Sequence, residues 1–371
     1  MLDRLGHFRI LGPLGGGGMA DVFLARRDDP LAPLVALKCL RPSLARDPEL
    51  LLAFQDEARA LSHVADPRVV RLLESGACEG TCYLALEYVA GPDLAHLVRA
   101  LRSRGRLAPI EAVLAVADDL LAGLHAAHEA RDERGRPLHL VHRDVSPHNV
   151  LVSPSGICKL ADFGLARFER QAHHTQGNDA RGKLSYLAPE QLNASGLDRR
   201  VDIWAAALVI HELATLDHPL AGRTDLETVH RICGTRVPPL ARTRRDVPPE
   251  LDLVLELAFA PTAAARFETA RAFREALRCA MPVSDGALRI ARLVELGFPD
   301  GLPPPAFPSP LSPARVHPAR TRSRLLHAAA GALVGAALAT GASLLAHRLA
   351  SPAPSSLQST PSLTARGAAC P

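Results

Sequence analysis

The sequence predicts an α+β fold in which a small β-rich lobe precedes a larger helical lobe. Up to about residue 90, short runs of β-forming residues dominate, as in 22–25 and 83–86, and one helix interrupts them. After residue 93, long helical patterns take over, such as 109–128 and 201–216. The second of these is apolar on almost every face, so we expect it to be the buried central helix of its lobe.

Composition divides the 371 residues into four parts. Residues 8–280 are mixed, periodic and globular, with lobes predicted at 8–90 and 91–280. Residues 281–324 are rich in Pro, Ser and Arg and predict an extended linker, within which 287–296 could form one short helix. Residues 325–347 are almost wholly apolar, and 348–371 form a tail too short to fold alone.

The overall composition excludes several classes of protein. A hydrophobic fraction of 47% supports a real core and excludes wholesale disorder. The net charge of +4 is small, and no basic run with interleaved aromatic residues is present, so nucleic acid is not an expected partner. The seven cysteines are scattered without zinc-site spacing, which favours reduced thiols packed as small side chains. Residues 1–10 lack the apolar core of a secretory signal.

A glycine-rich stretch between two β-like runs is the first candidate binding element. It consists of Gly15, Gly16, Gly17 and Gly18, followed by Met19, Ala20 and Val22. Glycine allows close backbone approach, so the N–H groups of such a loop can cover phosphates. A flexible hairpin turn explains the four glycines equally well.

Lysine is rare in this chain, which makes each lysine informative. Of 43 basic residues only three are lysines: Lys38, Lys159 and Lys183. Lys38 follows a β-like run, and Glu57 lies on a helix predicted to begin with Asp47 as N-cap and Pro48 in its first turn. Glu57 shares the apolar stripe of that helix, and a carboxylate there needs a partner, for which Lys38 is the obvious candidate.

A third set of motifs decides the family resemblance. Residues 141–151 read Val-His-Arg-Asp-Val-Ser-Pro-His-Asn-Val-Leu, and Ala-Asp-Phe-Gly follows at 161–164. Ala-Pro-Glu stands at 188–190 and Asp-Ile-Trp at 202–204. With the glycine-rich loop and Val-Ala-Leu-Lys at 35–38, the chain closely resembles a eukaryotic-like (Hanks-type) bacterial serine/threonine protein kinase over residues 8–280.

The resemblance implies a bilobal protein kinase fold that uses ATP and Mg²⁺, with Mn²⁺ as a second candidate ion. Asp144 would accept the substrate hydroxyl proton, Lys38 would hold the α- and β-phosphates, and Glu57 would orient Lys38. Asn149 and Asp162 would bind the metal ion. Glu87 to Val89 would form the hinge beside gatekeeper Leu86. The implied nucleotide-binding residues are Leu14, Gly15, Gly16, Gly17, Gly18, Met19, Ala20, Val22, Ala36, Lys38, Glu57, Glu87, Val89 and Leu151.

Further residues receive structural or regulatory roles from the same resemblance. Glu190 is expected to pair with Arg266, and Asp202 to brace the catalytic loop. His142, Phe163 and Leu61 are expected to stack in the interior of the domain. Arg143 precedes Asp144, an arrangement associated with control by phosphorylation, and the expected phosphorylation sites are Thr175 first and Ser185 second.

Two positions depart from the pattern of the family. The residue two places after the catalytic aspartate is usually lysine and here is Ser146; the residue at 183 is usually threonine and here is Lys183. In the family fold these positions face each other beside the aspartate. The hypothesis is therefore an exchange, in which Lys183 supplies catalytic charge that Ser146 lacks. The alternative is that Lys183 is exposed and incidental.

Residues 328–346 are 19 residues without a charge, about enough to span a bilayer as one helix. Nine of them are alanine, so a packing helix in a soluble protein is the alternative. Arginines are more frequent before the segment than after it, which predicts a single-pass protein of the plasma membrane with its catalytic domain in the cytoplasm. Gly331 and Gly335 form a G-x-x-x-G step through which, or through the kinase domain, a homodimer could form.

The predicted activity is transfer of the γ-phosphoryl group of ATP to serine and threonine hydroxyls of proteins, including autophosphorylation, in bacterial signal transduction. The main alternative is a pseudokinase scaffold that binds nucleotide without efficient catalysis, which only Ser146 favours. A small-molecule phosphotransferase is a second alternative, and the complete Ala-Pro-Glu segment argues against it. Tyrosine specificity is disfavoured but stays open, because Ser146-Pro147-His148 matches neither usual pattern.

Overall fold

The computed structural model describes residues 3–16, 19–163, 183–193, 197–234 and 236–302. Thr175 and the apolar segment 325–347 lie outside these ranges, so the predictions made for them stay predictions. Among the described helices, none has the length and apolar content needed to cross a bilayer.

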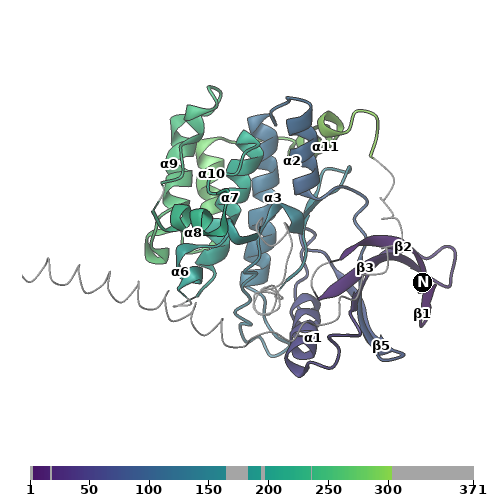
Figure 1. Ribbon diagram of the computed structural model, residues 1–371. Coiled ribbons are helices and arrows are strands. Elements are labelled where there is room, and N and C mark those ends of the chain that lie inside the picture. The colour runs from purple at the N-terminus through teal and green to yellow at the C-terminus, as the bar shows by residue number, and fades with distance from the viewer. Residues whose placement is uncertain (1–2, 17–18, 164–182, 194–196, 235, 303–371) are drawn as a thin grey trace, which may run out of the picture. The chain divides into compact units, whose positions relative to one another are not determined.

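The N-terminal lobe is built on one antiparallel sheet, as the short β-forming runs predict. Its strands follow the spatial order β1-β2-β3-β4-β6-β5. Their bounds are β1 Arg4–Leu5, β2 Phe8–Gly16, β3 Ala20–Arg27, β4 Leu34–Leu40, β5 Leu72–Cys78 and β6 Thr81–Glu87. In Figure 1 this sheet and helix α1 (Pro48–Ser62) form the part of the molecule that contains the N-terminus.

Helix α1 begins where its sequence predicts. The Asp47 carboxylate caps it by accepting hydrogen bonds from the N–H groups of Glu49 (3.0 Å) and Leu50 (3.4 Å). Its buried residues recur at helical spacing and form one stripe: Leu50, Ala53, Phe54, Glu57 and Leu61. The predicted place of Glu57 on this apolar stripe is therefore confirmed, and the helix directs a carboxylate into the interior.

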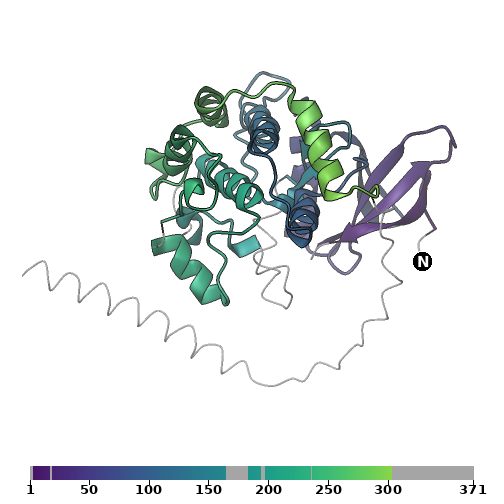
Figure 2. The same ribbon diagram turned by 90° about the horizontal axis from the view of Figure 1, so that it is seen from above.

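The C-terminal lobe is helical, and the two longest predicted helices are present as α3 (Ile110–His128) and α7 (Arg200–Thr215). Nearly every residue of α7 is buried, which confirms it as the central helix of its lobe. Around these two lie α2 Leu94–Ser103, α6 Pro189–Leu192, α8 Asp225–Gly234, α9 Pro249–Ala258 and α10 Ala270–Ala280 (Figures 1 and 2).

A short hairpin lies between α3 and the helices that follow it. The 3₁₀ turn η1 (Pro147–Asn149) leads directly into β7 (Val150–Val152), which pairs with β8 (Cys158–Leu160). The loop before η1 and the residues just after β8 carry the motifs at 142–149 and 161–163. The hairpin thus brings the two motifs to the same end of the lobe.

One helix extends the domain past its predicted end at residue 280. Helix α11 (Gly286–Gly297) matches the short helix expected at 287–296, but it packs into the core instead of standing in an extended linker. Ile290, Leu293 and Val294 are each at most 4% exposed and belong to the main hydrophobic cluster. Their spacing of three and four residues is an apolar helical stripe, so the extended linker cannot begin at 281.

Candidate active site

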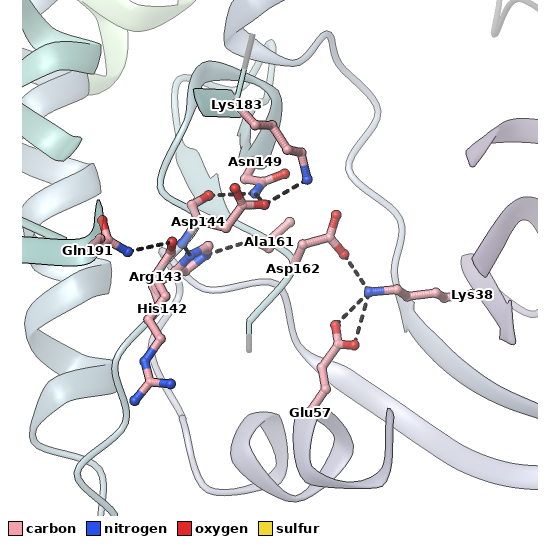
Figure 3. A network of polar contacts seen from close by, with 10 residues as sticks. All are labelled: Lys38, Glu57, His142, Arg143, Asp144, Asn149, Ala161, Asp162, Lys183 and Gln191. Carbon is pink, nitrogen blue, oxygen red and sulfur yellow. Dashed lines mark hydrogen bonds and ion pairs between the residues drawn. The ribbon is translucent and has the colours of Figure 1, made fainter. Parts of the chain in front are cut away.

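A buried lysine joins the sheet, helix α1 and the segment after β8. Lys38 lies within β4, opposite Val22 of β3 and Leu84 of β6. Its Nζ donates to both oxygens of Glu57 (2.8 and 3.0 Å) and to Oδ1 of Asp162 (2.8 Å), as Figure 3 shows. The predicted Lys38–Glu57 ion pair is confirmed; the contact with Asp162 connects it to the second lobe.

The charges of this cluster stabilise one another. Burial alone lowers the pKa of Lys38, but the negative charges of Asp162 and Glu57 outweigh burial and raise it above its usual value. The positive charge of Lys38 in turn lowers the pKa of Asp162, against the opposing effect of burial. At neutral pH the site therefore holds the ammonium of Lys38 beside the ionised carboxylate of Asp162, as expected of a site that positions phosphates and a divalent ion.

The second cluster surrounds Asp144. The side-chain amide of Asn149 donates to the Asp144 backbone carbonyl (2.7 Å) and to Oδ2 (3.0 Å). The Nζ of Lys183 donates to the same Oδ2 at 2.8 Å (Figure 3). Lys183 is therefore ion-paired at the site, with its side chain 35% exposed, and its catalytic role stays a prediction. Ser146 is 1% exposed, and its Oγ has no hydrogen-bond partner among the described residues.

Asp202 of α7 forms hydrogen bonds with the backbone of the loop that carries Asp144. Asp202 is 1% exposed and accepts from the backbone N–H of His142 (2.8 Å) and of Arg143 (2.7 Å). Arg143 and Asp162 both have left-handed backbone conformations, with φ of 64° and 59°. The bracing role predicted for Asp202 agrees with these hydrogen bonds.

His142 connects the two motif segments. The N–H of Asp144 donates to its Nδ1 (3.3 Å), so Nδ1 is the acceptor and Nε2–H donates to the Ala161 carbonyl (2.9 Å). The ring lies 4.6 Å from that of Phe163, and Leu61 of α1 belongs to the same hydrophobic cluster as Phe163. The ring contact of His142 with Phe163 agrees with the predicted internal stack, and the place of Leu61 in it stays a prediction.

The segment that ends in α6 is anchored to the helical lobe. The guanidinium of Arg266 makes a two-bond ion pair with Glu190 (2.6 and 2.9 Å), which confirms the predicted partner. The same guanidinium lies 4.9 Å above the Trp204 ring. Gln191 donates to the carbonyl of Arg143 (3.4 Å), so this segment also contacts the catalytic loop.

The other predicted nucleotide-binding residues divide into two groups. Leu14, Gly15 and Gly16 belong to β2, Val22 to β3, Ala36 to β4 and Leu151 to β7, whereas Gly17 and Gly18 lie outside the described residues. Ala36 pairs with Leu86 of β6, which brings it beside the residues predicted for the hinge, Glu87 to Val89.

One of these predictions needs correction at the level of the side chain. Met19 is 1% exposed and packs with Leu50 and Ala53 of α1, so its side chain points into the core. Only its backbone remains for contact with a ligand. The neighbouring Ala20 is also buried, at 5% exposure. A flexible apolar side chain beside an amphipathic helix gains more from burial than from contact with a polar ligand.

Of the two expected phosphorylation sites, only Ser185 is described. It is 2% exposed, so its hydroxyl is not accessible to a second protein in this conformation. This burial argues against Ser185 as a phosphorylation site, because a kinase must reach the hydroxyl directly.

The sequence reasoning missed Lys159 of β8. Its Nζ pairs with both carboxylate oxygens of Glu87, at 2.8 and 2.9 Å. Glu87 ends β6, so the pair connects the sheet of the N-terminal lobe with the β7–β8 hairpin at the predicted hinge. The rarity of lysine could have revealed it, since all three lysines of the chain are paired with carboxylates around this site.

The oxygen atoms at the site fit a magnesium ion. The Asn149 side-chain nitrogen is occupied by Asp144, which leaves its carbonyl oxygen as the other polar atom of the amide. The Asp162 side chain is 48% exposed and uses Oδ1 for Lys38. One carboxylate and one amide oxygen suit Mg²⁺ when phosphate oxygens complete the shell. Among the described residues no group of three or more His, Cys, Asp or Glu could hold a metal by itself.

The fold is the two-lobed protein kinase fold, with the buried cluster of Lys38, Glu57 and Asp162 between the sheet and the β7–β8 hairpin. Residues 8–272 match the family model described as "Protein kinase domain". The chain therefore belongs to the protein kinase family.

Similar proteins come from several bacteria. The chain is 36% identical over 279 residues to "Tyrosine-protein kinase MasK" of Myxococcus xanthus, covering 75% of this chain and 43% of that protein. It is 32% identical over 265 residues to "Serine/threonine-protein kinase PrkC" of Bacillus subtilis, covering 71% of this chain and 39% of that protein. The matched part is therefore less than half of each relative's length.

A solved structure has the same fold. The kinase domain of PknI from Mycobacterium tuberculosis superposes with a TM-score of 0.56 at 29% identity, over 74% of this chain and 96% of that domain. The likeness thus spans nearly the whole of that domain.

Proposed function

We propose that this chain transfers the γ-phosphoryl group of ATP to serine or threonine hydroxyls of proteins, with Mg²⁺ as the metal ion. The observation that carries the proposal is the meeting of Lys38, Asp162, Asn149 and Asp144 at one place, with Lys38 bonded to both Glu57 and Asp162. Bound Mg²⁺ would neutralise phosphate charge between Asp162 and Asn149.

The residues of the chain have separate tasks in this reaction. Lys38 holds the phosphates of the nucleotide, and Glu57 keeps its ammonium in place. The substrate hydroxyl oxygen forms a bond to the γ-phosphorus while the bond from that phosphorus to the β–γ bridging oxygen breaks, and ADP leaves with that electron pair. Asp144 takes the proton of the hydroxyl.

The test is phosphate transfer by the full chain with labelled ATP and Mg²⁺, followed by phosphoamino-acid analysis, beside Asp144→Asn. We expect label on serine or threonine that the variant loses, because it keeps the shape of Asp144 but not its basicity. Label on tyrosine alone would contradict the proposed serine/threonine specificity. This outcome is worth testing because one relative, MasK, is named as a tyrosine kinase.

The pseudokinase alternative has its own outcome in the same experiment. Binding of Mg²⁺–ADP without any transfer of label would favour a scaffold and overturn the proposal. The complete set of Lys38, Glu57, Asp144, Asn149 and Asp162 supports catalysis instead, because a scaffold has no need of a base beside the phosphate site.

We extend the proposal to autophosphorylation at Thr175. Arg143 has a buried Nε without a hydrogen-bond partner among the described residues, so a phosphate contact would satisfy it. Mass spectrometry of the chain after incubation with ATP should find phosphate on Thr175 and lose it in Thr175→Ala. Phosphate confined to residues 303–371 would contradict this assignment.

We also propose that residues 325–347 anchor the chain in the plasma membrane, with the kinase domain in the cytoplasm. The uncharged 328–346 segment and the arginines before it support this. The proposal predicts that the full chain sediments with membranes and resists carbonate extraction, whereas a chain that ends at 302 does not. Release of the full chain by carbonate would overturn it. A homodimer through Gly331 and Gly335 belongs to the same proposal, and cross-linking of Gly331→Ile, compared with the unchanged chain, tests it.

A further inference from the structure

Lys183 lies next to Asp144, the candidate catalytic base. The catalytic loop itself has no lysine or arginine at this place. We propose that the Lys183 ammonium contacts the transferring phosphoryl group and neutralises its charge in the transition state. The inference rests on the proposed kinase activity and adds one catalytic residue to it.

The first support is geometry. Lys183 Nζ is 2.8 Å from Asp144 Oδ2, the carboxylate that would accept the proton of the substrate hydroxyl. The hydroxyl oxygen lies between the base and the γ-phosphorus during transfer. A cation in contact with the base is therefore within one side chain's reach of the transferring group.

The second support is the distribution of charge. Phosphoryl transfer depends mainly on positioning and on neutralising phosphate charge. Lys38 is already bonded to two carboxylates, and the guanidinium of Arg143 extends away from Asp144 (Figure 3). Between Asp144 and Asn149 the sequence has no lysine or arginine, and Ser146 is buried. Among the described residues drawn in this network, Lys183 is the cation placed on the Asp144 side.

The third support is the residue type. Only three of the 43 basic residues are lysines, and the other two pair with Glu57 and Glu87 in the same region. An ammonium has three N–H donors on a compact group, so it can donate to Asp144 and to a phosphoryl oxygen together. The Lys183 side chain is 35% exposed, which leaves it accessible to a ligand.

The location of Lys183 has a consequence for control. It lies six residues before Pro189, in the segment anchored by Glu190 to Arg266 and by Gln191 to the Arg143 carbonyl. The proposed catalytic cation thus belongs to this segment and not to the loop of Asp144. A conformational change that moves this segment away from the catalytic loop would also move the Lys183 ammonium away from Asp144.

The experiment compares Lys183→Met with an exchange variant in the full chain. The exchange variant carries both Lys183→Met and Ser146→Lys. Lys183→Met should lower kcat by about 100-fold, as expected for loss of one transition-state donor, with little change in KM for ATP. The exchange variant should recover at least about tenfold of this loss, because it returns an ammonium to the loop that carries Asp144. Arg199→Met is the matched control, since Arg199 is also 35% exposed and ion-paired, with Glu129.

A second measurement separates catalysis from a structural role. Mg²⁺–ADP with aluminium fluoride mimics the transferring group, so Lys183→Met should weaken its binding by about 100-fold and leave the binding of Mg²⁺–ADP unchanged. Equal weakening of both ligands would show that Lys183 only holds the site together and would overturn the inference. Unchanged kcat in Lys183→Met would overturn it as well, while an inactive wild-type chain would overturn the proposed function on which it rests.

Discussion

Single buried polar residues decide the conformation of the loops around the site. Asp202 is the clearest case, because both of its oxygens are used: Oδ1 by the N–H of Arg143, and Oδ2 by the N–H of His142 and Nε2 of His128. Burial alone raises the pKa of Asp202, but these hydrogen bonds, above all the one from His128, hold the pKa below its usual range. A charged acceptor under the loop thereby offsets the cost of the left-handed backbone at Arg143.

We expect protonation of His218 to lower the stability of the domain in mild acid. Its Nδ1 accepts from the N–H groups of Leu220 and Ala221, both at 3.1 Å, so protonation would break both bonds. Burial chiefly, with the nearby His211, lowers the pKa of His218 from 6.5 to about 4. The unfolded chain therefore binds the proton first: the stabilisation is complete above pH 6.5 and is lost as the pH falls toward 4.

The expected loss is up to about 3 kcal/mol. About 2 kcal/mol of this loss falls between pH 7.5 and pH 5, and urea unfolding at these two pH values measures it. His218→Asn, whose amide oxygen can accept the same bonds, should reduce the pH dependence. An equal dependence in both chains would show that other groups cause it.

At the scale of elements, two contacts between segments distant in sequence shape the domain. Lys159 joins β8 to the end of β6 through Glu87, and Gly156 lies against the first turn of α11. A Cβ built on Gly156 would lie 1.9 Å from the Ala287 carbonyl oxygen, and its φ is +86°. The β7–β8 turn therefore accepts α11 only because residue 156 has no side chain.

Replacement of Gly156 by alanine tests this packing. Gly156→Ala should destabilise the domain by about 1–3 kcal/mol more than Gly135→Ala. Gly135 is the matched control because its φ is +76° but no atom lies within 4 Å of the position that a Cβ would take there. The two variants thus share the backbone strain and differ in the clash. Equal melting temperatures of the two variants would mean that α11 does not pack closely against the β7–β8 turn.

Removal of the Lys159 ammonium tests the connection at the hinge. The pair is partly exposed, at 14% and 31% for the two side chains, so it contributes up to about 1 kcal/mol. Lys159→Met should therefore raise the KM for ATP by up to about fivefold with little change in kcat. The charge-reversed variant Lys159→Glu with Glu87→Lys should restore part of the affinity. A fall in kcat at constant KM would argue for a different role.

At the scale of the whole molecule, the folded unit is longer than the part that matches the family. The family model ends at residue 272, whereas α11 continues the core to Gly297. Ile290, Leu293 and Val294 are nearly fully buried, so their removal exposes apolar surface on α3 and α2.

A chain that ends at 281 should accordingly be less stable than one that ends at 302 by roughly 5 kcal/mol, the burial of three aliphatic side chains. That is comparable with the whole stability of many domains. Thermal melts of the two chains measure the difference. Coincident melts would show that α11 is dispensable and that the domain ends near 280 after all.

Local signals allowed much of this protein to be predicted from its sequence. The cap at Asp47, the apolar stripe that includes Glu57 and the all-round burial of α7 depend on residues close together in the chain, and the structure agrees with them. The ion pair Lys38–Glu57 was predictable because a buried charge requires a partner, whereas the pair Glu190–Arg266 was predictable only from the family resemblance.

Only the tertiary structure decided the rest. It showed that Lys38 also contacts Asp162, that Lys159 pairs with Glu87, that the Met19 side chain is buried and that α11 packs on the domain. The physical reason is that periodicity and capping specify which face of an element is buried. Which other element covers that face depends on contacts between residues far apart in the chain.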